Sequence, residues 1–153
     1  MFDVSLKNNE IYKESDTYKS GSKLETFTIS GYKFGHSICY DLRFPKLFRY
    51  LAKIGSKVIV IPSAFTFNTG KSHWHTLVRA RAIENGVFIL APNQCGTNNE
   101  KRSTYGHSMV VNPWGEIVAE AEDKEMIINC EIDLKEVEEI QKSIPVLKHD
   151  IDF

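Results

Sequence analysis

Residues 57–91, KVIVIPSAFTFNTGKSHWHTLVRARAIENGVFILA, decide the fold because two short apolar runs flank a helical pattern. The runs at 57–61 and 87–91 each stop at a proline, and unbroken β-branched runs of this length are typical of strands buried on both faces. Residues 71–85 between them predict a helix, and Gly86 is its candidate C-cap. The apolar stripe of this helix consists of Trp74, Leu77, Val78 and Ile83. A strand–helix–strand order predicts parallel pairing of the two strands.

The sequence before this unit predicts a hairpin and a short helix. Residues 1–23 are polar with little periodicity, so we expect a loop there. Residues 24–30 and 32–39 each favour a strand, joined by a turn at Ser30-Gly31, and the second strand is expected to end at Cys39. Pro45 then suits the first turn of a helix.

The sequence after this unit predicts antiparallel strands beside the parallel ones. Residues 107–111 and 116–121 are apolar stretches on either side of Asn112-Pro113-Trp114-Gly115, a favourable hairpin turn. Residues 126–134, MIINCEIDL, predict a further strand, and residues 134–141 a closing helix. The whole pattern indicates an α/β fold.

Composition excludes several classes of function. The chain has 153 residues, 42% hydrophobic and 25% charged, with a formal net charge of −1, so we expect one globular domain. This balance indicates no nucleic-acid partner, and no apolar run has the length of a membrane span. The three cysteines are odd in number and widely spaced, which favours free thiols in a reducing, cytoplasmic compartment.

Cys39, in GHSICYDLRFP, is the candidate nucleophile. A residue at a strand end exposes its side chain at the rim of the sheet, where the following backbone amides can point at a bound carbonyl. A thiol there attacks an amide or nitrile carbon only with a lowered pKa or a neighbouring base. A lone cysteine is more commonly a buried structural residue, so position alone leaves both interpretations open.

Four sequence blocks, in order and at suitable spacing, resemble the nitrilase (carbon–nitrogen hydrolase) superfamily. They are GHSICYDLRFPKL, IPSAF, HWHTLVRARAIENGVF and QCGTNNEKRSTYGHSMVVNPWGEIVAEA, and the likeness runs from Phe2 to about Val146. The last block is most similar to the Nit-type branch, with its deaminated glutathione amidases and ω-amidases. The resemblance implies an αββα sandwich, here incomplete because the N-terminal part of the family domain has no counterpart. We expect a partial domain over residues 1–145 and a short C-terminal tail over 146–153.

The resemblance also assigns roles to individual residues. It implies that Cys39 is the nucleophile and that the backbone N–H of Tyr40 is an oxyanion donor, with Glu14 as a supporting glutamate. Arg43 matches an arginine that holds a substrate carboxylate in some members, and Phe65, in IPSAF, is expected to bind substrate. The alternative for Arg43, a structural ion pair with Asp41 or Glu84, stays open.

The implied reaction is hydrolysis of the C–N bond in small 2-oxo-acid or peptide-like amides, with ammonia released through a Cys39 thioester and no metal or cofactor. The family's general-base glutamate and catalytic lysine match no residue of this chain. The alternatives are therefore an inactive truncated remnant, or a subunit of a split enzyme that needs an N-terminal partner chain. A homodimer is a further possibility. His75 stands where relatives carry a glutamate after His-Trp, which puts a local ion pair in doubt.

Two rival sites are weaker. A Cys–His hydrolase would use His73 or His107, whereas His36 lies at an odd offset from Cys39 along the strand and points to the other face. A metal site would need ligands on one face, but His73 and His75 are two residues apart on a predicted helix. We therefore predict no metal site.

Overall fold

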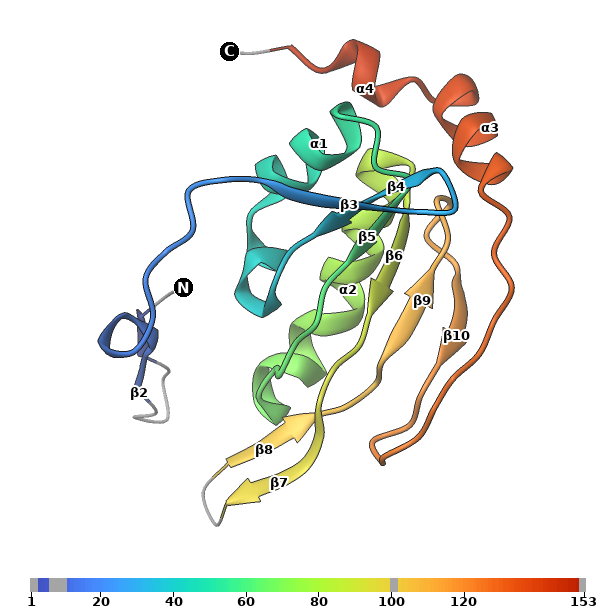
Figure 1. Cartoon of the computed structure of the whole chain (residues 1–153). Coiled ribbons are helices and arrows are strands. Elements are labelled where there is room, and N and C mark those ends of the chain that lie inside the picture. Colours follow the sequence, from blue (N-terminus) through green and yellow to red (C-terminus); the bar gives the residue numbers. More distant parts are fainter. Residues whose placement is uncertain (1–2, 6–10, 100–101, 152–153) are drawn as a thin grey trace.

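The computed structural model describes residues 3–5, 11–99 and 102–151, and a six-stranded sheet forms its centre (Figure 1). The strand order is β10-β9-β6-β5-β4-β3. The strands of this sheet are β3 (Glu25–Ile29), β4 (Tyr32–His36), β5 (Val58–Val60), β6 (Phe88–Ala91), β9 (Met109–Val111) and β10 (Ile117–Glu120). The α-helices are α1 (Pro45–Lys53), α2 (Phe67–Asn85), α3 (Lys135–Ser143) and α4 (Val146–His149). The predicted α/β class is confirmed.

Strands β4, β5 and β6 form the parallel middle of the sheet, and the remaining pairs are antiparallel. The predicted parallel pairing of residues 57–61 with 87–91 is confirmed, with Val58 opposite Phe88. Helix α2 connects these strands, beginning after Thr66, whose side chain accepts a hydrogen bond from the backbone of Thr69. It ends at Gly86, which adopts the left-handed conformation at φ 59°, as the predicted C-cap requires.

Helices α1 and α2 cover one face of the sheet and enclose the main core. The alternation along each strand places Ile59, Ile89 and Val111 on this face, and all three are fully buried. They pack with helix residues that include Phe48, Leu51, Trp74, Val78 and Ala82. No helix among residues 3–5, 11–99 and 102–151 is long and apolar enough to cross a bilayer.

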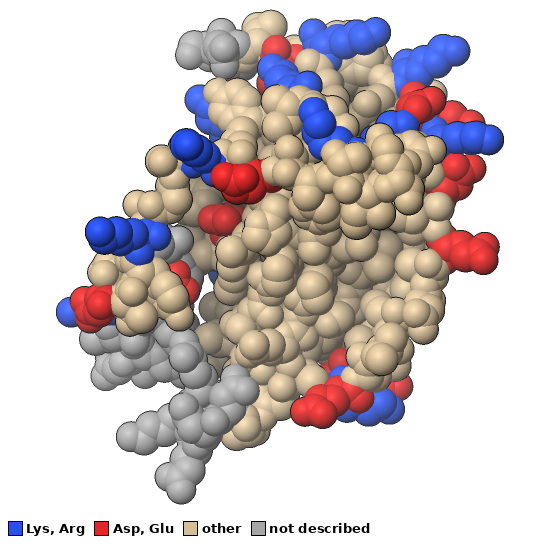
Figure 2. Space-filling model, viewed as in Figure 1, with Lys and Arg blue, Asp and Glu red and all other residues tan. Residues whose placement is uncertain are grey.

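The opposite face of the sheet is apolar and only partly covered. Phe27, Phe34, Val58 and Phe88 form a row across four adjacent strands on this face. Val137 of α3 packs on Val58 and Phe88, whereas Phe27 at the outer end of the row is 41% exposed. In Figure 2 the charged residues lie mainly at the margins of the face turned to the viewer, and its middle is almost free of charge.

Three sequence predictions of local structure are wrong in part. Residues 126–134 form no strand among the described residues, and Ile127 is 86% exposed, because this extended segment has no hydrogen-bonded partner strand there. The second strand ends at His36, and Cys39 instead begins a 3₁₀ turn. Ile83 is 50% exposed, although part of its side chain lies against the β9–β10 turn, where a Cβ at Gly115 would be 2.4 Å from its Cγ1.

Two short hairpins were not predicted. Strands β1 (Asp3–Ser5) and β2 (Ile11–Lys13) pair within the region expected to be a loop, and the 3₁₀ turn η1 (Glu14–Asp16) follows them. Strands β7 (Cys95–Asn99) and β8 (Arg102–Tyr105) form a second hairpin that projects from the sheet, shown in yellow in Figure 1. The predicted hairpin around residues 112–115 is confirmed as β9–β10.

Candidate active site

Cys39 lies where the carboxyl ends of the parallel strands meet. Its backbone N–H donates to the carbonyl of Pro62 at 2.9 Å, just beyond the end of β5. Cys39 begins the 3₁₀ turn η2 (Cys39–Arg43) with a φ of 46°, a left-handed conformation that a non-glycine residue rarely adopts. Strain of this kind costs about 1–3 kcal/mol and gathers at functional sites. The carboxyl edge of parallel strands is also where α/β proteins bind ligands.

The Cys39 thiol is partly buried, and this burial is the main reason that its pKa is raised above the ordinary value. Hydrogen bonds from the backbone amides of Ala64 and Tyr40 act in the opposite direction, because they stabilise the thiolate. The carboxylates of Glu14 and Asp41 raise the pKa further through charge repulsion. The surroundings described here therefore keep the thiol protonated near neutral pH, and a nucleophile in this position requires a base.

Two backbone amides meet at the sulfur of Cys39. The N–H of Tyr40 is the one that the sequence predicts as an oxyanion donor, and the N–H of Ala64 is a second donor that the sequence analysis missed. Ala64 follows Ser63, whose N–H donates to the carbonyl of Pro92 at 2.9 Å, so the segment after β5 is held against the segment after β6. The sequence feature that could have indicated the N–H of Ala64 was the position of IPSAF immediately after a predicted parallel strand.

Glu14 is brought close to Cys39, as the sequence leads us to expect. It begins η1, and its carbonyl accepts hydrogen bonds from the backbone of Thr17 and Tyr18 at 3.0 and 2.9 Å. Its carboxylate is near enough to raise the pKa of the Cys39 thiol by charge. This charge disfavours the thiolate form of Cys39.

Arg43 ends η2 and presents its guanidinium between two aromatic rings. The guanidinium carbon is 5.6 Å from the centroid of Tyr40 and 5.4 Å from that of Phe65. Its Nη2 is 3.3 Å from Nδ1 of His73, which accepts this hydrogen bond in its neutral form. The guanidinium is thus held by contacts that leave its charge without a carboxylate partner among the residues described.

The alternative ion pairs of Arg43 are not formed among the residues that the structure describes. Asp41 accepts a hydrogen bond from the backbone of Ile38 at 2.9 Å and so caps the turn that carries Cys39. Glu84 pairs with Arg81 at 2.9 Å. Asp41 and Glu84 therefore do not neutralise the charge of Arg43.

Phe65 forms the buried floor beside Arg43. It is 5% exposed, and its ring lies 4.9 Å from the ring of Trp74 in the main core. Its backbone N–H donates to Oδ1 of Asn93 at 3.0 Å, while Nδ2 of Asn93 donates to the carbonyl of Gly106 at 2.6 Å. Asn93 is therefore a positioning residue for the segment that carries Ala64 and Phe65, and it was not singled out from the sequence.

The histidines considered as alternative bases for Cys39 contact other side chains. His73 contacts Arg43, and Nδ1 of His107 lies 2.8 Å from Oε1 of Glu120. His75 also contacts Glu120, at 2.8 Å through Nε2, which confirms that His73 and His75 face in different directions along α2.

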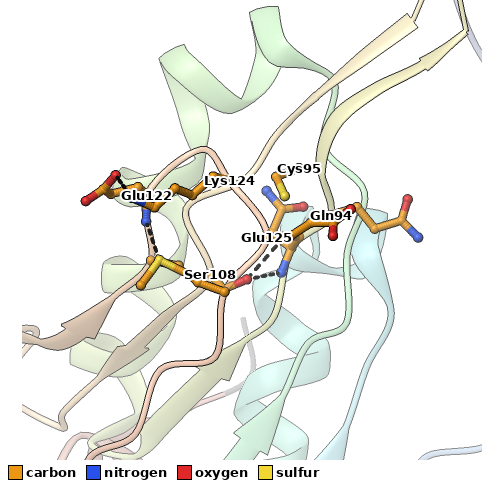
Figure 3. Close-up of a pocket in the computed structure, with 9 residues that line it drawn as sticks. Gln94, Cys95, Ser108, Glu122, Lys124 and Glu125 are labelled. Carbon is orange, nitrogen blue, oxygen red and sulfur yellow. Dashed lines mark hydrogen bonds and ion pairs between the residues drawn. The ribbon is translucent and has the colours of Figure 1, made fainter.

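A separate pocket opens beside the loop that follows β10 (Figure 3). Its walls come from Asn93–Cys95, Ser108, Ala121, Glu122 and Lys124–Met126. Ser108 Oγ accepts from the Asn93 N–H at 2.9 Å, and Lys124 pairs with Glu122 at 2.7 Å. Cys39 and Arg43 are not among the residues that line this pocket, whereas Asn93 is shared between the pocket wall and the segment of Phe65.

The comparisons with known proteins define the class of protein. The family described as carbon-nitrogen hydrolase matches residues 1–142. The chain therefore belongs to the carbon–nitrogen hydrolase family, and its nitrilase-type α/β fold is confirmed by solved structures of that family.

Three relatives show how similar the chain is to known members of this family. A deaminated glutathione amidase from Synechocystis is 42% identical over 152 residues, which cover 97% of this chain and 56% of the relative. The crystal structure of the Caenorhabditis elegans NitFhit protein is 41% identical with a TM-score of 0.88, covering 98% of this chain and 37% of that one. A mutant amidase from Nesterenkonia, with covalent addition of the acetamide moiety of fluoroacetamide at its active site cysteine, is 26% identical with a TM-score of 0.67. The match covers 75% of this chain and 44% of the amidase.

These values also show that the chain spans little more than half the length of the Synechocystis relative.

Proposed function

We propose that this chain carries the nucleophile of a thiol-dependent hydrolase that cleaves the C–N bond of small amides. The observation that carries the proposal is the position of Cys39, at the carboxyl edge of the parallel strands with the amides of Tyr40 and Ala64 at its sulfur. The thiolate adds to the amide carbon, and the C–N bond breaks as the nitrogen takes a proton and leaves as ammonia. Water then hydrolyses the thioester and releases the acid and the thiol.

Stabilisation of the tetrahedral intermediate is the role proposed for the two backbone amides. Donors aimed at developing charge are worth about 10²–10³ in rate for each donor. The Nesterenkonia amidase supports the assignment of the nucleophile, because its active site cysteine takes a covalent acetamide group.

Recognition of a carboxylate is the role proposed for Arg43. The guanidinium is braced by Tyr40, Phe65 and His73, and its planar fork suits bidentate binding of a carboxylate. This supports a 2-oxo acid or a peptide-like acid as the part of the substrate that remains bound to sulfur. The name of the Synechocystis relative, deaminated glutathione amidase, agrees with that substrate class.

Two groups of the proposed reaction match no residue of the chain. The family resemblance implies a general-base glutamate and a lysine, and the raised pKa of Cys39 shows why a base is needed. We propose that both groups come from a polypeptide segment outside these 153 residues. Because of this raised pKa, we expect little activity from these 153 residues by themselves.

The partly covered face of the sheet supports a complementing segment as partner. The outer end of the row, where Phe27 is 41% exposed, would be buried by a second sheet layer, as in an αββα sandwich. An N-terminal complementing chain is the partner that we propose, with a homodimer as the alternative. The three free cysteines favour a reducing compartment such as the cytoplasm.

Ammonia release tests the proposed function. The chain would be assayed on 2-oxoglutaramate and deaminated glutathione, alone and co-expressed with the N-terminal half of the Synechocystis relative. We expect activity from the pair, little or none from the chain alone, and none from a pair carrying Cys39→Ala. A folded pair that remains inert contradicts the proposed function, and activity that survives Cys39→Ala contradicts the mechanism.

A further inference from the structure

A cluster of two imidazoles and one carboxylate lies away from Cys39. His75 comes from α2, His107 from the segment between β8 and β9, and Glu120 from the end of β10. Oε1 of Glu120 is 2.8 Å from Nε2 of His75 and 2.8 Å from Nδ1 of His107. The three ligand-type atoms all lie within 4.8 Å of one another. Three elements that are distant in sequence therefore converge on one small volume.

The position of His107 in this cluster is fixed by its surroundings. Its carbonyl accepts a hydrogen bond of 2.8 Å from Nε1 of the fully buried Trp74, and its φ of 56° is left-handed. The ring of Tyr105 stacks on the imidazole with centroids 4.4 Å apart. The ring of His75 lies 5.5 Å from that of His107 at a steep angle. Such contacts preorganise the donor atoms before a ligand arrives.

We propose that His75, His107 and Glu120 form a binding site for a divalent transition-metal ion, with Zn²⁺ as the best fit. Imidazole nitrogen suits Zn²⁺, Cu²⁺ and Ni²⁺, whereas Mg²⁺ and Ca²⁺ prefer sites made of oxygen atoms. Two histidines and a glutamate form a three-ligand protein set that binds Zn²⁺ elsewhere and leaves a fourth position for water.

Binding requires only local adjustment of the cluster. Ligand bonds of roughly 2.0–2.1 Å place the donors of a tetrahedral ion about 3.4 Å apart. Both imidazole nitrogens are 2.8 Å from Oε1 of Glu120, so each must move about 0.6 Å away from that oxygen to make room for the ion. When both imidazoles are neutral, the N–H groups at His75 Nε2 and His107 Nδ1 donate hydrogen bonds to the carboxylate of Glu120. When an ion binds, each neutral ring carries its proton on the other nitrogen and offers the freed lone pair to the metal.

An ion from solution can reach the site. The side chains of His75, His107 and Glu120 are 33%, 28% and 31% exposed. A bound ion would link α2 to β10 and to the segment that precedes β9. It would therefore stabilise the folded chain by an amount that grows with the logarithm of its concentration over its dissociation constant. The site is structural in this proposal, because Cys39 and Arg43 belong to other elements and contribute no donor to it.

Zinc binding to the full chain tests the proposal. Titration calorimetry with ZnCl₂ would use a Cys130→Ser background, so that the exposed thiol does not compete. We expect a single site that His75→Gln and Glu120→Gln each weaken by more than about tenfold. The matched control is His149→Gln, which removes an exposed histidine on α4 and should leave the affinity unchanged. Circular dichroism of each variant checks that it is folded.

Cobalt substitution provides a second readout. Co²⁺ in the cluster should show the visible bands of a tetrahedral nitrogen and oxygen site, without the charge-transfer absorption of a thiolate ligand. ZnCl₂, but not MgCl₂, should raise the melting temperature of the chain, and His75→Gln should abolish this rise. Equal zinc affinity in His75→Gln and the control, or a thiolate spectrum, would overturn the proposal, as would the absence of binding to a folded chain.

Discussion

The backbone N–H of Cys39 donates to the carbonyl of Pro62 at 2.9 Å, and this bond extends the parallel pairing of β4 and β5 past their ends. A matching bond joins Ser63 to Pro92 after β5 and β6. Together they hold Cys39 beside the chain that follows β5, so the amide of Ala64 meets the sulfur of Cys39. The position of Cys39 thus follows from the sheet and not from the loop alone.

The pH dependence of Cys39 alkylation follows from this environment. Since burial raises the pKa of the thiol above its ordinary value, the thiolate fraction near neutral pH is small and grows only in alkaline solution. We expect the rate of iodoacetamide labelling to keep rising with pH after the labelling of an ordinary exposed thiol has levelled off. Peptide mass spectrometry measures this rate, with the exposed Cys130 as the internal reference. Labelling of Cys39 that is already maximal at neutral pH would contradict the account.

Arg43→Gln should discriminate between substrates in the complemented enzyme. A hydrogen bond to a charged group is worth about 1.5–3 kcal/mol, so kcat/KM for a 2-oxo-acid amide should fall by roughly tenfold to a hundredfold. The value for a neutral aliphatic amide should barely change. Steady-state ammonia release measures both, with Arg49→Gln on α1 as the control, since Arg49 pairs with Asp150. An equal loss on both substrates would show that Arg43 is structural.

Asn93→Ala should destabilise the fold by about 2–4 kcal/mol, because it leaves two buried backbone groups without partners. These are the N–H of Phe65 and the carbonyl of Gly106. Urea denaturation measures the free energy of unfolding. The neighbouring Gln94 is exposed, and Gln94→Ala should change it by less than about 0.5 kcal/mol. Similar small effects of both substitutions would refute the positioning role of Asn93.

Gly70→Ala should also destabilise the chain, although alanine is the better helix former by about 1 kcal/mol. A Cβ at Gly70 would lie 2.2 Å from Cβ of Tyr105, so α2 and β8 would have to separate, at a cost of about 1–3 kcal/mol. The control is Gly21→Ala, where nothing lies within 4 Å of the added carbon. The same denaturation experiment tests the pair, and a Gly70→Ala chain more stable than the parent would contradict this packing.

Local sequence signals predicted the centre of the fold well. The apolar runs that became β5 and β6 are bounded by prolines, and Gly86 ends α2 in the required left-handed conformation. Residues 126–134 show the limit of the same reasoning. Their pattern suits a strand, but a strand exists only when a neighbour supplies its hydrogen bonds, and none does so among the described residues.

The sequence analysis missed features that form only when segments distant in sequence meet in the folded structure. Cys39, Glu14 and Tyr40 could be identified by family likeness, and the structure brings Glu14 to Cys39. The amide of Ala64 carries no side-chain signal, and the sequence indicates it only through the position of IPSAF after a predicted parallel strand. The cluster of His75, His107 and Glu120 was missed because its members come from three elements, while ligand spacing in sequence detects only neighbours.

The most direct test of the central claim is the mass of the Cys39 peptide during turnover. The complemented enzyme would be mixed with 2-oxoglutaramate, quenched in acid and digested for mass spectrometry. We predict that the acyl part of the substrate, without its amide nitrogen, is attached to Cys39. An acyl group on Cys95 or Cys130 instead, or turnover that continues with Cys39→Ala, would contradict the assignment of Cys39 as the nucleophile.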